Sequence, residues 1–255
     1  MLKETLSVVI ITKNEQDKIA RCLKTVDWAD EIVVVDDLST DRTVEICQEF
    51  GAKVISHKSC GNFDRQRNIG MDNARGEWIL QMDADEVIPE DLKEAIEKAI
   101  SQNSEFCGFQ FRRKNFFLGH FMRYGGFYGP YSLKLFKKSC GRYVGHSVHE
   151  TLKVEGKIGT IEADINHYAF QTIAQNIERN NMYSTVRAKL MKEEKGALDK
   201  KELRYNLTIR PLKRFWKMYV KKRGYRDGMY GLVFCVLFTF GPMLRWMKYW
   251  ELSKD

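Results

Sequence analysis

Short apolar runs alternate with amphipathic stretches along the first hundred residues. Four runs end at polar or charged residues and are typical of buried strands: 7–11, 31–35, 52–55 and 78–82. Between them, apolar residues recur at helical spacing, which predicts helices near 19–26, 44–50 and 65–74. Strand–helix alternation of this length predicts an α/β fold, with a mostly parallel sheet flanked by helices.

Polar segments follow three of these strands where each strand ends. They are Thr-Lys-Asn-Glu at 12–15, Asp-Asp at 36–37 and Asp-Ala-Asp at 83–85. Ligands of open α/β sheets bind beyond the carboxyl ends of the strands, so we expect these segments to share one site. An extended chain would present Asp83 and Asp85 on one face. Alone, Asp-x-Asp also fits a solvated turn; with the other two segments it indicates a divalent cation that bridges to nucleotide phosphates.

Beyond residue 88, the pattern predicts both helices and strands, without the regular alternation of the first hundred residues. The pattern predicts an amphipathic helix over 89–100, strands over 106–111 and 133–136, and a helical stretch from 172 to 195. Residues 124–130 read Tyr-Gly-Gly-Phe-Tyr-Gly-Pro, which excludes a regular helix and predicts a shaped loop. Such a loop either stacks on a sugar or closes over a site, or it covers the edge of the sheet.

Positive charge is concentrated in the last quarter of the chain. Residues 200–255 hold 14 Lys and Arg against 4 Asp and Glu, whereas the whole chain carries a net charge of +8. A nucleic-acid-binding protein would show a basic face on its folded core, so this placement argues against nucleic acid as a partner. A basic tail with aromatic residues is more typical of contact with an anionic membrane surface.

The tail contains a largely apolar stretch of 16 residues from Met229 to Leu244, which Gly231, Gly241 and Pro242 interrupt. A spanning helix needs about 20 apolar residues, so the pattern predicts a helix lying in the membrane surface. The alternative is a helix that packs on the catalytic domain or on a second copy of the chain.

Cysteine usage and the start of the chain bear on the compartment. The six cysteines are scattered without a CxxC pair, which argues against a zinc site or a disulfide framework and fits a reducing cytosol. The first apolar run is too short for the core of a signal peptide. We therefore expect a cytoplasmic protein, held peripherally at the inner face of the cytoplasmic membrane.

Four motifs occur in order along the first half. They read Val-Val-Ile-Ile-Thr-Lys-Asn-Glu from residue 8, Val-Val-Val-Asp-Asp-Leu-Ser-Thr-Asp from 33, Arg-Gln-Arg-Asn-Ile-Gly from 65 and Leu-Gln-Met-Asp-Ala-Asp-Glu from 80. In this order and spacing they resemble the family 2 glycosyltransferases of the GT-A fold. The segments at 145–150, 166–168 and 224–228 are similar to the branch that includes lipopolysaccharide inner-core β-glucosyltransferases.

The resemblance implies inverting transfer of a sugar from a nucleotide diphosphate sugar, usually a UDP-sugar, to a hydroxyl of a glycan or glycolipid. It implies a catalytic domain over 1–195, with a nucleotide-sugar half at about 1–100 and an acceptor half at 101–195, followed by a basic helical extension over 196–255. It also implies roles for individual residues. The base and ribose would contact Thr12, Asn14, Glu15 and Asp36 or Asp37; the nucleotide would be held by Arg65 or Arg67 with Asn68; Asp83 would face the ribose or the metal; and Asp85 would ligate Mg²⁺ or Mn²⁺.

The transfer needs a general base that takes the proton of the acceptor hydroxyl. Glu150 is the expected base, with Asp164 and Glu86 as reserves, and the alternative for Glu150 is a structural salt bridge. His149 or His167 is the expected third metal ligand, against the alternative of a structural histidine. Beyond residue 100, the chain lacks the Glu-Asp and Gln-x-x-Arg-Trp signatures of familiar family 2 members, which argues against a processive polysaccharide synthase.

Two other functions remain open from the sequence. A nucleotidyltransferase would also use carboxylates and nucleotides, but it would usually carry a glycine-rich phosphate loop where this chain has Thr-Lys-Asn-Glu. A non-catalytic, basic-tailed membrane-binding module is the second alternative.

Overall fold

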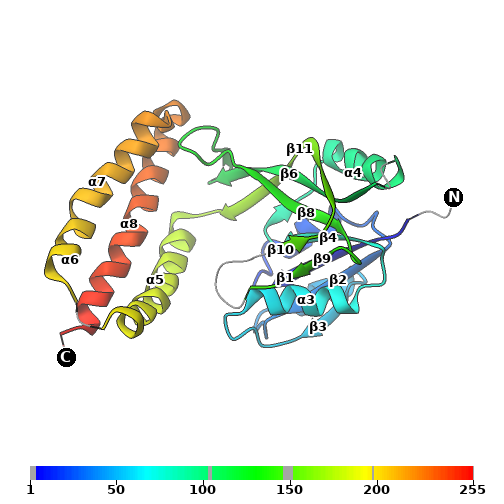
Figure 1. The fold of residues 1–255 in the computed structure, drawn as a ribbon, viewed down its shortest axis with the longest axis horizontal. Helices are drawn as coiled ribbons and strands as arrows, with labels where there is room; N and C mark the ends of the chain where they lie inside the picture. The colour runs from blue at the N-terminus through cyan, green and yellow to red at the C-terminus, as the bar shows by residue number, and fades with distance from the viewer. Residues whose placement is uncertain (1–3, 103–104, 146–151, 197, 255) are drawn as a thin grey trace. The chain divides into compact units, whose positions relative to one another are not determined.

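The computed structural model describes residues 4–102, 105–145, 152–196 and 198–254. The chain forms two compact units. The first, here called the α/β unit, comprises Met1–Arg113 and Pro130–His167; the second, the helical unit, comprises Lys114–Gly129 and Tyr168–Asp255. Figure 1 shows the strands and helices α3 and α4 in the first unit and the long helices α5–α8 in the second.

A mixed sheet of nine strands organises the α/β unit, in the order β3-β2-β1-β4-β8-β6-β11-β5; the short β7, which belongs to the helical unit, pairs with the end of β6. The strands are β1 (Leu6–Thr12), β2 (Glu31–Asp36), β3 (Lys53–Ser56), β4 (Trp78–Asp83), β5 (Glu86–Val87), β6 (Phe106–Phe117), β7 (His120–Phe121), β8 (Tyr131–Lys137) and β11 (Lys157–Phe170). A separate two-stranded sheet pairs β9 (Gly141–Tyr143) with β10 (Leu152–Val154).

The strands from the first hundred residues, β3, β2, β1 and β4, are parallel as predicted. The later strands are not, because β8 pairs antiparallel with both β4 and β6. β5 likewise runs antiparallel to β11. The sheet is therefore parallel from β3 to β4 and antiparallel in its remaining part, and the predicted α/β class with a C-terminal helical extension is confirmed.

Successive residues of the parallel strands pack on opposite faces of the sheet, which explains their continuous apolar character. On one face, Val8 and Leu80 join the core formed by α1 (Ile19–Lys24), α2 (Thr43–Glu49) and α4 (Glu90–Gln102). On the other face, Val9 and Ile79 pack with residues of α3 (Phe63–Asn73) and β9. Burial on both faces fixes where each strand ends, and thus which polar residues stand at the edge.

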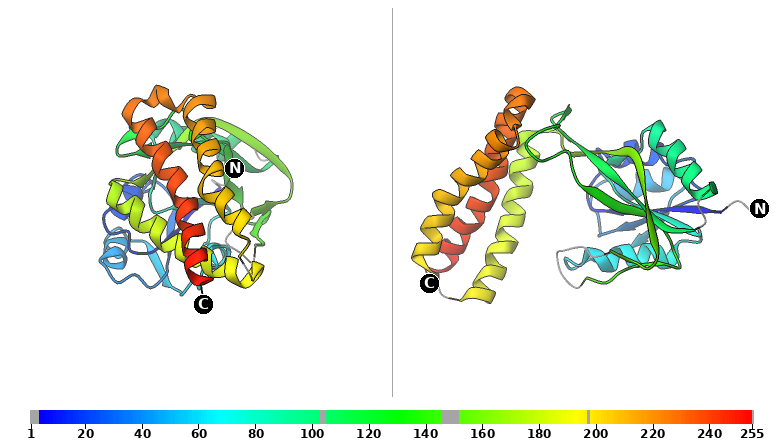
Figure 2. Two further views of the ribbon diagram at one scale, coloured as in Figure 1. Left: turned by 90° about the vertical axis from the view of Figure 1, so that its left-hand side faces the viewer. Right: turned by 45° about the horizontal axis from the view of Figure 1, so that its top comes forward.

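The helical unit consists mainly of α5 (Ile173–Lys195), α6 (Lys200–Leu207), α7 (Ile209–Trp216) and α8 (Gly228–Leu252). A π-helical turn, Lys217–Lys221, and a 3₁₀ turn, Gly224–Asp227, connect α7 to α8. Helices α5, α6 and α7 each contact α8 and run beside it in Figure 2. Phe117, Met218 and Phe234 form one buried cluster of this unit, and Ala188, Trp246 and Tyr249 form another.

The compact units divide the chain differently from the predicted boundary at residue 195. Residues 114–129 and α5, both assigned to the catalytic domain from the sequence, belong to the helical unit. For α5 the reason is its packing along α8, in which Ala188 lies in one buried cluster with Trp246. An amphipathic pattern shows that a helix has a buried face but does not show which neighbour covers it.

The apolar stretch of the tail forms a longer helix than its composition suggested. Helix α8 has 25 residues and continues through Gly231, Gly241 and Pro242. Together with the preceding 3₁₀ turn, Gly224–Leu252 is long and apolar enough to cross a membrane by length and composition alone. The expectation that this stretch is too short to span was therefore wrong, because flanking residues extend the helix. Membrane contact itself stays a prediction.

Gly70 on α3 lets this helix approach β1 closely. A Cβ atom at this position would lie 2.3 Å from Cγ1 of Val9 and 3.2 Å from Cγ2 of Val35. Both valines are fully buried β-branched residues, so neither can move aside easily. In an open helix, replacing glycine with alanine would instead stabilise by up to about 1 kcal/mol.

We expect Gly70→Ala to lower the free energy of unfolding by about 1–3 kcal/mol, because overpacking outweighs the gain in helix propensity. Urea unfolding followed by circular dichroism measures this. Arg65→Ala, on the exposed side of the same helix, should stay within about 0.5 kcal/mol of the parent chain. A Gly70→Ala variant at least as stable as the parent would contradict the close packing of α3 on β1.

Candidate active site

The three polar segments predicted to share a site lie at one edge of the sheet. Thr12, at the end of β1, is in register with Asp36 at the end of β2. On the other side of β1, Ile11 is in register with Asp83 at the end of β4. Because all three strands are parallel, their carboxyl ends meet. The roles of individual residues in binding stay predictions.

The segment after β1 is anchored to the loop after β2. The amide of Asn14 donates to Oγ of Ser39 at 2.8 Å, and Oδ1 of Asn14 accepts from the amide of Thr40 at 2.8 Å. Glu15 forms an ion pair with Lys18 at 2.7 Å. Asn14 and Glu15 therefore spend part of their bonding capacity on shaping the loop. Thr12 differs, since its buried Oγ1 has no hydrogen-bond partner among the residues that the structure describes.

Asp36 and Asp37 are both buried and both bonded within the protein. Asp36 accepts a hydrogen bond from the amide of Ser39 at 2.9 Å. The carboxylate of Asp37 accepts from the amide and hydroxyl of Ser59, each at 2.7 Å. Burial would raise the pKa of Asp37, but these bonds and Lys13 at 3.1 Å outweigh it and hold the pKa below its ordinary value. Asp37 is therefore an ionised anchor for the loop after β3.

Two arginines and an asparagine on α3 were predicted to hold the nucleotide. In the structure these three side chains have different surroundings. Arg67 is buried and its Nη2 lies 3.1 Å from Oδ1 of Asp83. Arg65 is exposed. Asn68 donates to the carbonyl of Tyr143 at 2.8 Å and accepts from the amide of Tyr143 at 3.1 Å, so it joins α3 to β9. Of the two arginines, only Arg67 reaches the acidic strand tip.

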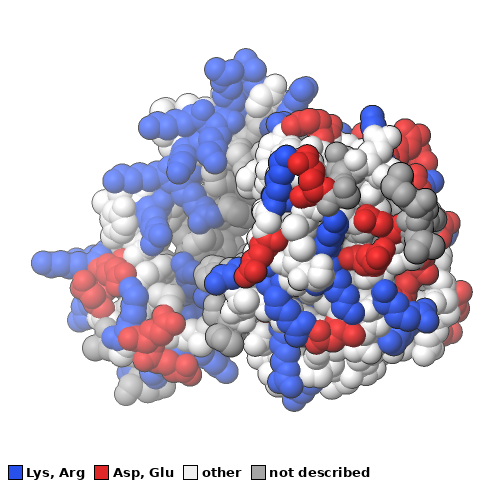
Figure 3. Space-filling model, turned by 45° about the vertical axis from the view of Figure 1, so that its right-hand side comes forward, with Lys and Arg blue, Asp and Glu red and all other residues white. Residues whose placement is uncertain are grey.

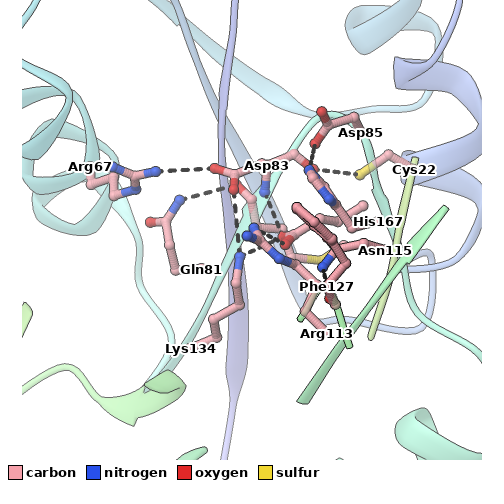
Figure 4. A network of polar contacts seen from close by, with 12 residues as sticks. Cys22, Arg67, Gln81, Asp83, Asp85, Arg113, Asn115, Phe127, Lys134 and His167 are labelled. Atoms are coloured by element: carbon pink, nitrogen blue, oxygen red, sulfur yellow. Dashed lines mark hydrogen bonds and ion pairs between the residues drawn. The ribbon is translucent and has the colours of Figure 1, made fainter. Parts of the chain in front are cut away.

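Asp83 lies between two cations. Besides Arg67, Nζ of Lys134 on β8 lies 3.6 Å from its Oδ2, and Figure 4 shows both side chains converging on it. Burial would raise the pKa of Asp83, but Lys134 and then Arg67 outweigh burial and hold the pKa well below its ordinary value. The side chain of Asp83 remains 30% exposed, so this ionised carboxylate is still accessible to a ligand.

Asp85 does not share the face of Asp83. Strand β4 ends at Asp83, and residues 84–85 form a turn before β5, so strand alternation stops before Asp85. Its Oδ1 lies 3.4 Å from Nε2 of His167, and Figure 4 shows it on the His167 side of the network. The premise that strand alternation puts both carboxylates on one face was therefore wrong, and a shared ligand for the two stays a prediction. The pairing of β5 with β11 places His167 in register with Glu86 and so brings it to the turn.

Glu86 forms the buried base of this cluster, with none of its side chain exposed. Its Oε2 lies 2.6 Å from Nζ of Lys134 and accepts a hydrogen bond from the amide of Asp83 at 3.0 Å. Its Oε1 lies 3.7 Å from Nη1 of Arg113. Burial raises the pKa of Glu86, which Lys134 only partly offsets, and Glu86 together with Asp83 raises the pKa of Lys134 despite its burial. These contacts make Glu86 a structural carboxylate more than a reserve base.

The acceptor-side predictions fall partly outside the described residues. Glu150 and His149 both lie there, so their predicted roles stay untested. Asp164 is a half-buried residue of β11, three positions before His167. Of the two histidines named as possible metal ligands, His167 is the one that the described structure places beside Asp85.

Lys134 and Arg113 are the members of the cluster that the sequence interpretation missed. Lys134 stands within the apolar strand sequence Leu-Lys-Leu-Phe, where a charge that is 9% exposed needs partners. That position was a usable signal, because a lysine inside a buried strand usually pairs with a carboxylate. Arg113 ends an alternating stretch and carried no comparable signal.

The donor atoms fit a divalent cation that completes its shell with ligand oxygens. No group of three or more His, Cys, Asp and Glu side chains able to hold a metal occurs in the part of the chain that the structure describes. Asp85 and His167 supply one carboxylate and one imidazole, and magnesium-type sites commonly take one or two protein ligands plus phosphate oxygens. Imidazole, the softer donor, favours Mn²⁺ over Mg²⁺ at this pair.

The chain is similar in sequence to glycosyltransferases of comparable length. An uncharacterized glycosyltransferase of Rickettsia conorii is 28% identical, covering 99% of this chain and 92% of its own. The lipopolysaccharide core biosynthesis glycosyltransferase LpsC of Rhizobium meliloti is 25% identical, covering 91% and 86%. Among solved structures, S. aureus TarS 1-349 in complex with UDP is 16% identical with a TM-score of 0.49, covering 98% and 90%.

The family assignment of the chain comes from the segment that runs from β1 to β9. Residues 7–152, more than half of the chain, match the sequence model described as glycosyl transferase family 2. The matched range contains the three strand-end segments, Arg67 and Lys134, and thus most of the charged cluster. The chain belongs to glycosyltransferase family 2.

Proposed function

We propose that this protein transfers a sugar from a UDP-sugar to a hydroxyl group of a glycan or glycolipid, with inversion at the anomeric carbon. Membership of family 2 supports sugar transfer. The observation that carries the proposal is the pairing of Asp85 with His167 next to an Asp83 that Arg67 and Lys134 hold ionised. These groups gather around Asp83 at the carboxyl end of β4, which pairs with the end of β1, and ligands of such sheets bind beyond these strand ends.

The nucleoside would lie over the ends of β1 and β2. Thr12 offers a buried hydroxyl that has no partner in the described part of the chain, which suits a hydrogen bond to the base. Asp36 and Asp37 are already bonded to Ser39 and Ser59, so their part is to shape this pocket. Asp83 is partly exposed and ionised, and its free lone pairs suit the ribose hydroxyls.

The diphosphate would lie between Asp83 and Asp85. A divalent cation held by Asp85 and His167 would neutralise charge on the leaving diphosphate. Arg67 and Lys134 keep Asp83 ionised and fix its orientation. Buried Glu86 holds the amide of Asp83, which sets the turn that carries Asp85. In this way the protein's own ion pairs position the two aspartates for different tasks.

Asp85→Asn should weaken UDP binding in the presence of Mn²⁺ by about tenfold or more, which corresponds to about 1.4 kcal/mol or more. The reason is the loss of the ligand charge that holds the cation. Isothermal titration with UDP, in Mn²⁺ and again in EDTA, measures it. Asp91→Asn, an exposed aspartate on α4, is the matched control. An equal loss of affinity with and without Mn²⁺ would remove Asp85 from the metal site.

The acceptor hydroxyl requires a general base, and we propose Glu150 for this role. The proposal rests on its position in the acceptor-side segment of the family resemblance. Glu86 suits the role poorly, because it is fully buried and already contacts Lys134 and Arg113. Asp164 on β11 is the remaining alternative.

Glu150→Gln should lower kcat by about 10²–10⁴-fold while the affinity for UDP changes little, because only proton removal in the transition state is lost. Turnover is measured as UDP released from the UDP-sugar that the protein uses. Asp164→Asn is the matched comparison, and it should retain most of the turnover. If Asp164→Asn were the more damaging change, the base would be Asp164.

A lipopolysaccharide core is the acceptor we propose, since the name of the LpsC relative describes that pathway. A lipid-linked acceptor also suits attachment of the helical unit to an anionic membrane surface. Leu212 is 71% exposed and Trp216 is 57% exposed, and Lys213 and Lys217 beside them are also exposed. Exposed apolar and aromatic side chains among cations are typical of interfacial helices. Co-sedimentation of the full chain with anionic vesicles tests the attachment, and its absence would reject it.

A further inference from the structure

Residues of α6, α7 and α8 line a small cavity within the helical unit. Its volume is about 30 Å³. One water needs about 10–15 Å³ by this kind of measure, so the cavity admits a small polyatomic group but not a nucleotide. The side chains that line it and bear on its chemistry are Asn206, Arg210, Arg214, Thr239, Arg245 and Trp246.

The cavity gathers cations without matching carboxylates. Arg210 and Arg214 come from α7, and Arg245 comes from α8. Among the described residues, none of these three arginines forms an ion pair with an Asp or Glu side chain. Figure 3 shows the Lys and Arg side chains gathered over the helical unit on the face turned to the viewer. Like charges held together in a partly buried place destabilise one another unless an anion offsets them.

Burial and the neighbouring arginines lower the pKa values of two arginines at the cavity. Burial lowers the pKa of Arg214, and Arg210 and Arg245 lower it further. Burial also lowers the pKa of Arg245, to which Arg187 on α5 and Arg210 add. Carboxylates normally hold arginine pKa values high, as Asp72 does for Arg142 in the α/β unit. Among the described residues, no carboxylate raises the pKa of Arg214 or Arg245 in this way.

Two residues that line the cavity, Arg245 and Trp246, carry buried N–H groups that donate no hydrogen bond to the described residues. Trp246 is 3% exposed, yet within the part of the chain that the structure describes its indole Nε1 has no hydrogen-bond partner, and the same is true of the buried Nε of Arg245. Both groups can only donate, so a partner must be an acceptor. Arg210 donates to Oδ1 of Asn206 at 2.7 Å, and the guanidinium of Arg214 lies 4.6 Å from the ring centroid of Phe238. These two contacts orient the guanidinium groups without neutralising them.

We propose that this cavity binds a phosphate group. Phosphate supplies the negative charge that three guanidinium groups lack and several acceptor oxygens for the unpaired donors of Arg245 and Trp246. Guanidinium groups suit the purpose because their planar donors match phosphate oxygens. The phosphate can be a free ion or small phosphate ester, or it can be the headgroup of an anionic lipid. The site is independent of the sugar-transfer proposal, since its test measures binding alone.

The test uses the full chain and inorganic phosphate, with ionic strength held constant by chloride. Phosphate should raise the thermal unfolding midpoint, because it binds the folded state only. Arg214→Gln and Arg245→Gln should each weaken phosphate affinity by about tenfold or more, as expected for losing a charge-assisted hydrogen bond. Lys200→Gln removes one exposed charge from the same unit and should change the affinity by less than about twofold.

A second arm distinguishes the source of the phosphate. Flotation compares vesicles of phosphatidylcholine alone with vesicles that also contain phosphatidic acid. Binding that needs phosphatidic acid, and that Arg214→Gln and Arg245→Gln abolish but Lys200→Gln retains, assigns the site to a lipid headgroup. Binding of inorganic phosphate with the same variant pattern, but without binding to either vesicle, assigns it to a soluble phosphate. If neither probe binds, or if the two arginine variants bind like the parent chain, the proposal is wrong.

Discussion

Lys134 supplies a positive charge between Asp83 and Glu86 beneath the edge of the sheet. Without it, the turn between β4 and β5 would bring these two carboxylates together in a buried place, where repulsion and desolvation would protonate one of them. With Nζ 2.6 Å from Glu86 and 3.6 Å from Asp83, the turn closes with Asp83 ionised. Removing one member of such a buried pair typically costs about 3–5 kcal/mol, so the local fold depends on it.

The placement of the neighbouring groups depends on that turn. Glu86 accepts the amide of Asp83, which ends β4 and sends the chain into β5. β5 then pairs with β11, and this pairing carries His167 to Asp85 across 82 residues of sequence. On the other side, Arg67 reaches Asp83 because Gly70 lets α3 lie close against β1. The two aspartates of one motif are thus separated, one toward cationic side chains and the other toward an imidazole.

The sequence predicted the first half of the fold well because its elements are local. Strands buried on both faces and helices with one apolar face follow from spacing, and so does the meeting of residues 12–15, 36–37 and 83–85 at one edge. The direction of β8 and β11 and the partner of α5 could not be predicted in the same way. They depend on pairing between segments far apart in the chain, which apolar spacing does not encode.

The same distinction applies to the site. Asp83 and Asp85 were recognisable as candidates, but their separation required knowing that β4 ends at Asp83. Lys134 was visible as a charge within an apolar strand, whereas its partners were not. The arginines at the α7–α8 cavity looked like a general basic tail in the sequence, and only the packing of two helices showed that three of them converge.

The central claim is that Asp83 stays with the protein's own cations and that Asp85 and His167 hold the metal. A crystal structure of the chain with UDP and Mn²⁺, with anomalous scattering collected at the manganese edge, tests it most directly. We expect one anomalous peak in contact with the Asp85 carboxylate and Nε2 of His167, with Lys134 still between Asp83 and Glu86. The assignment of the metal to Asp85 and His167 would be wrong if Asp83 coordinated the peak, Lys134 were displaced from Asp83, and His167 made no contact with the metal.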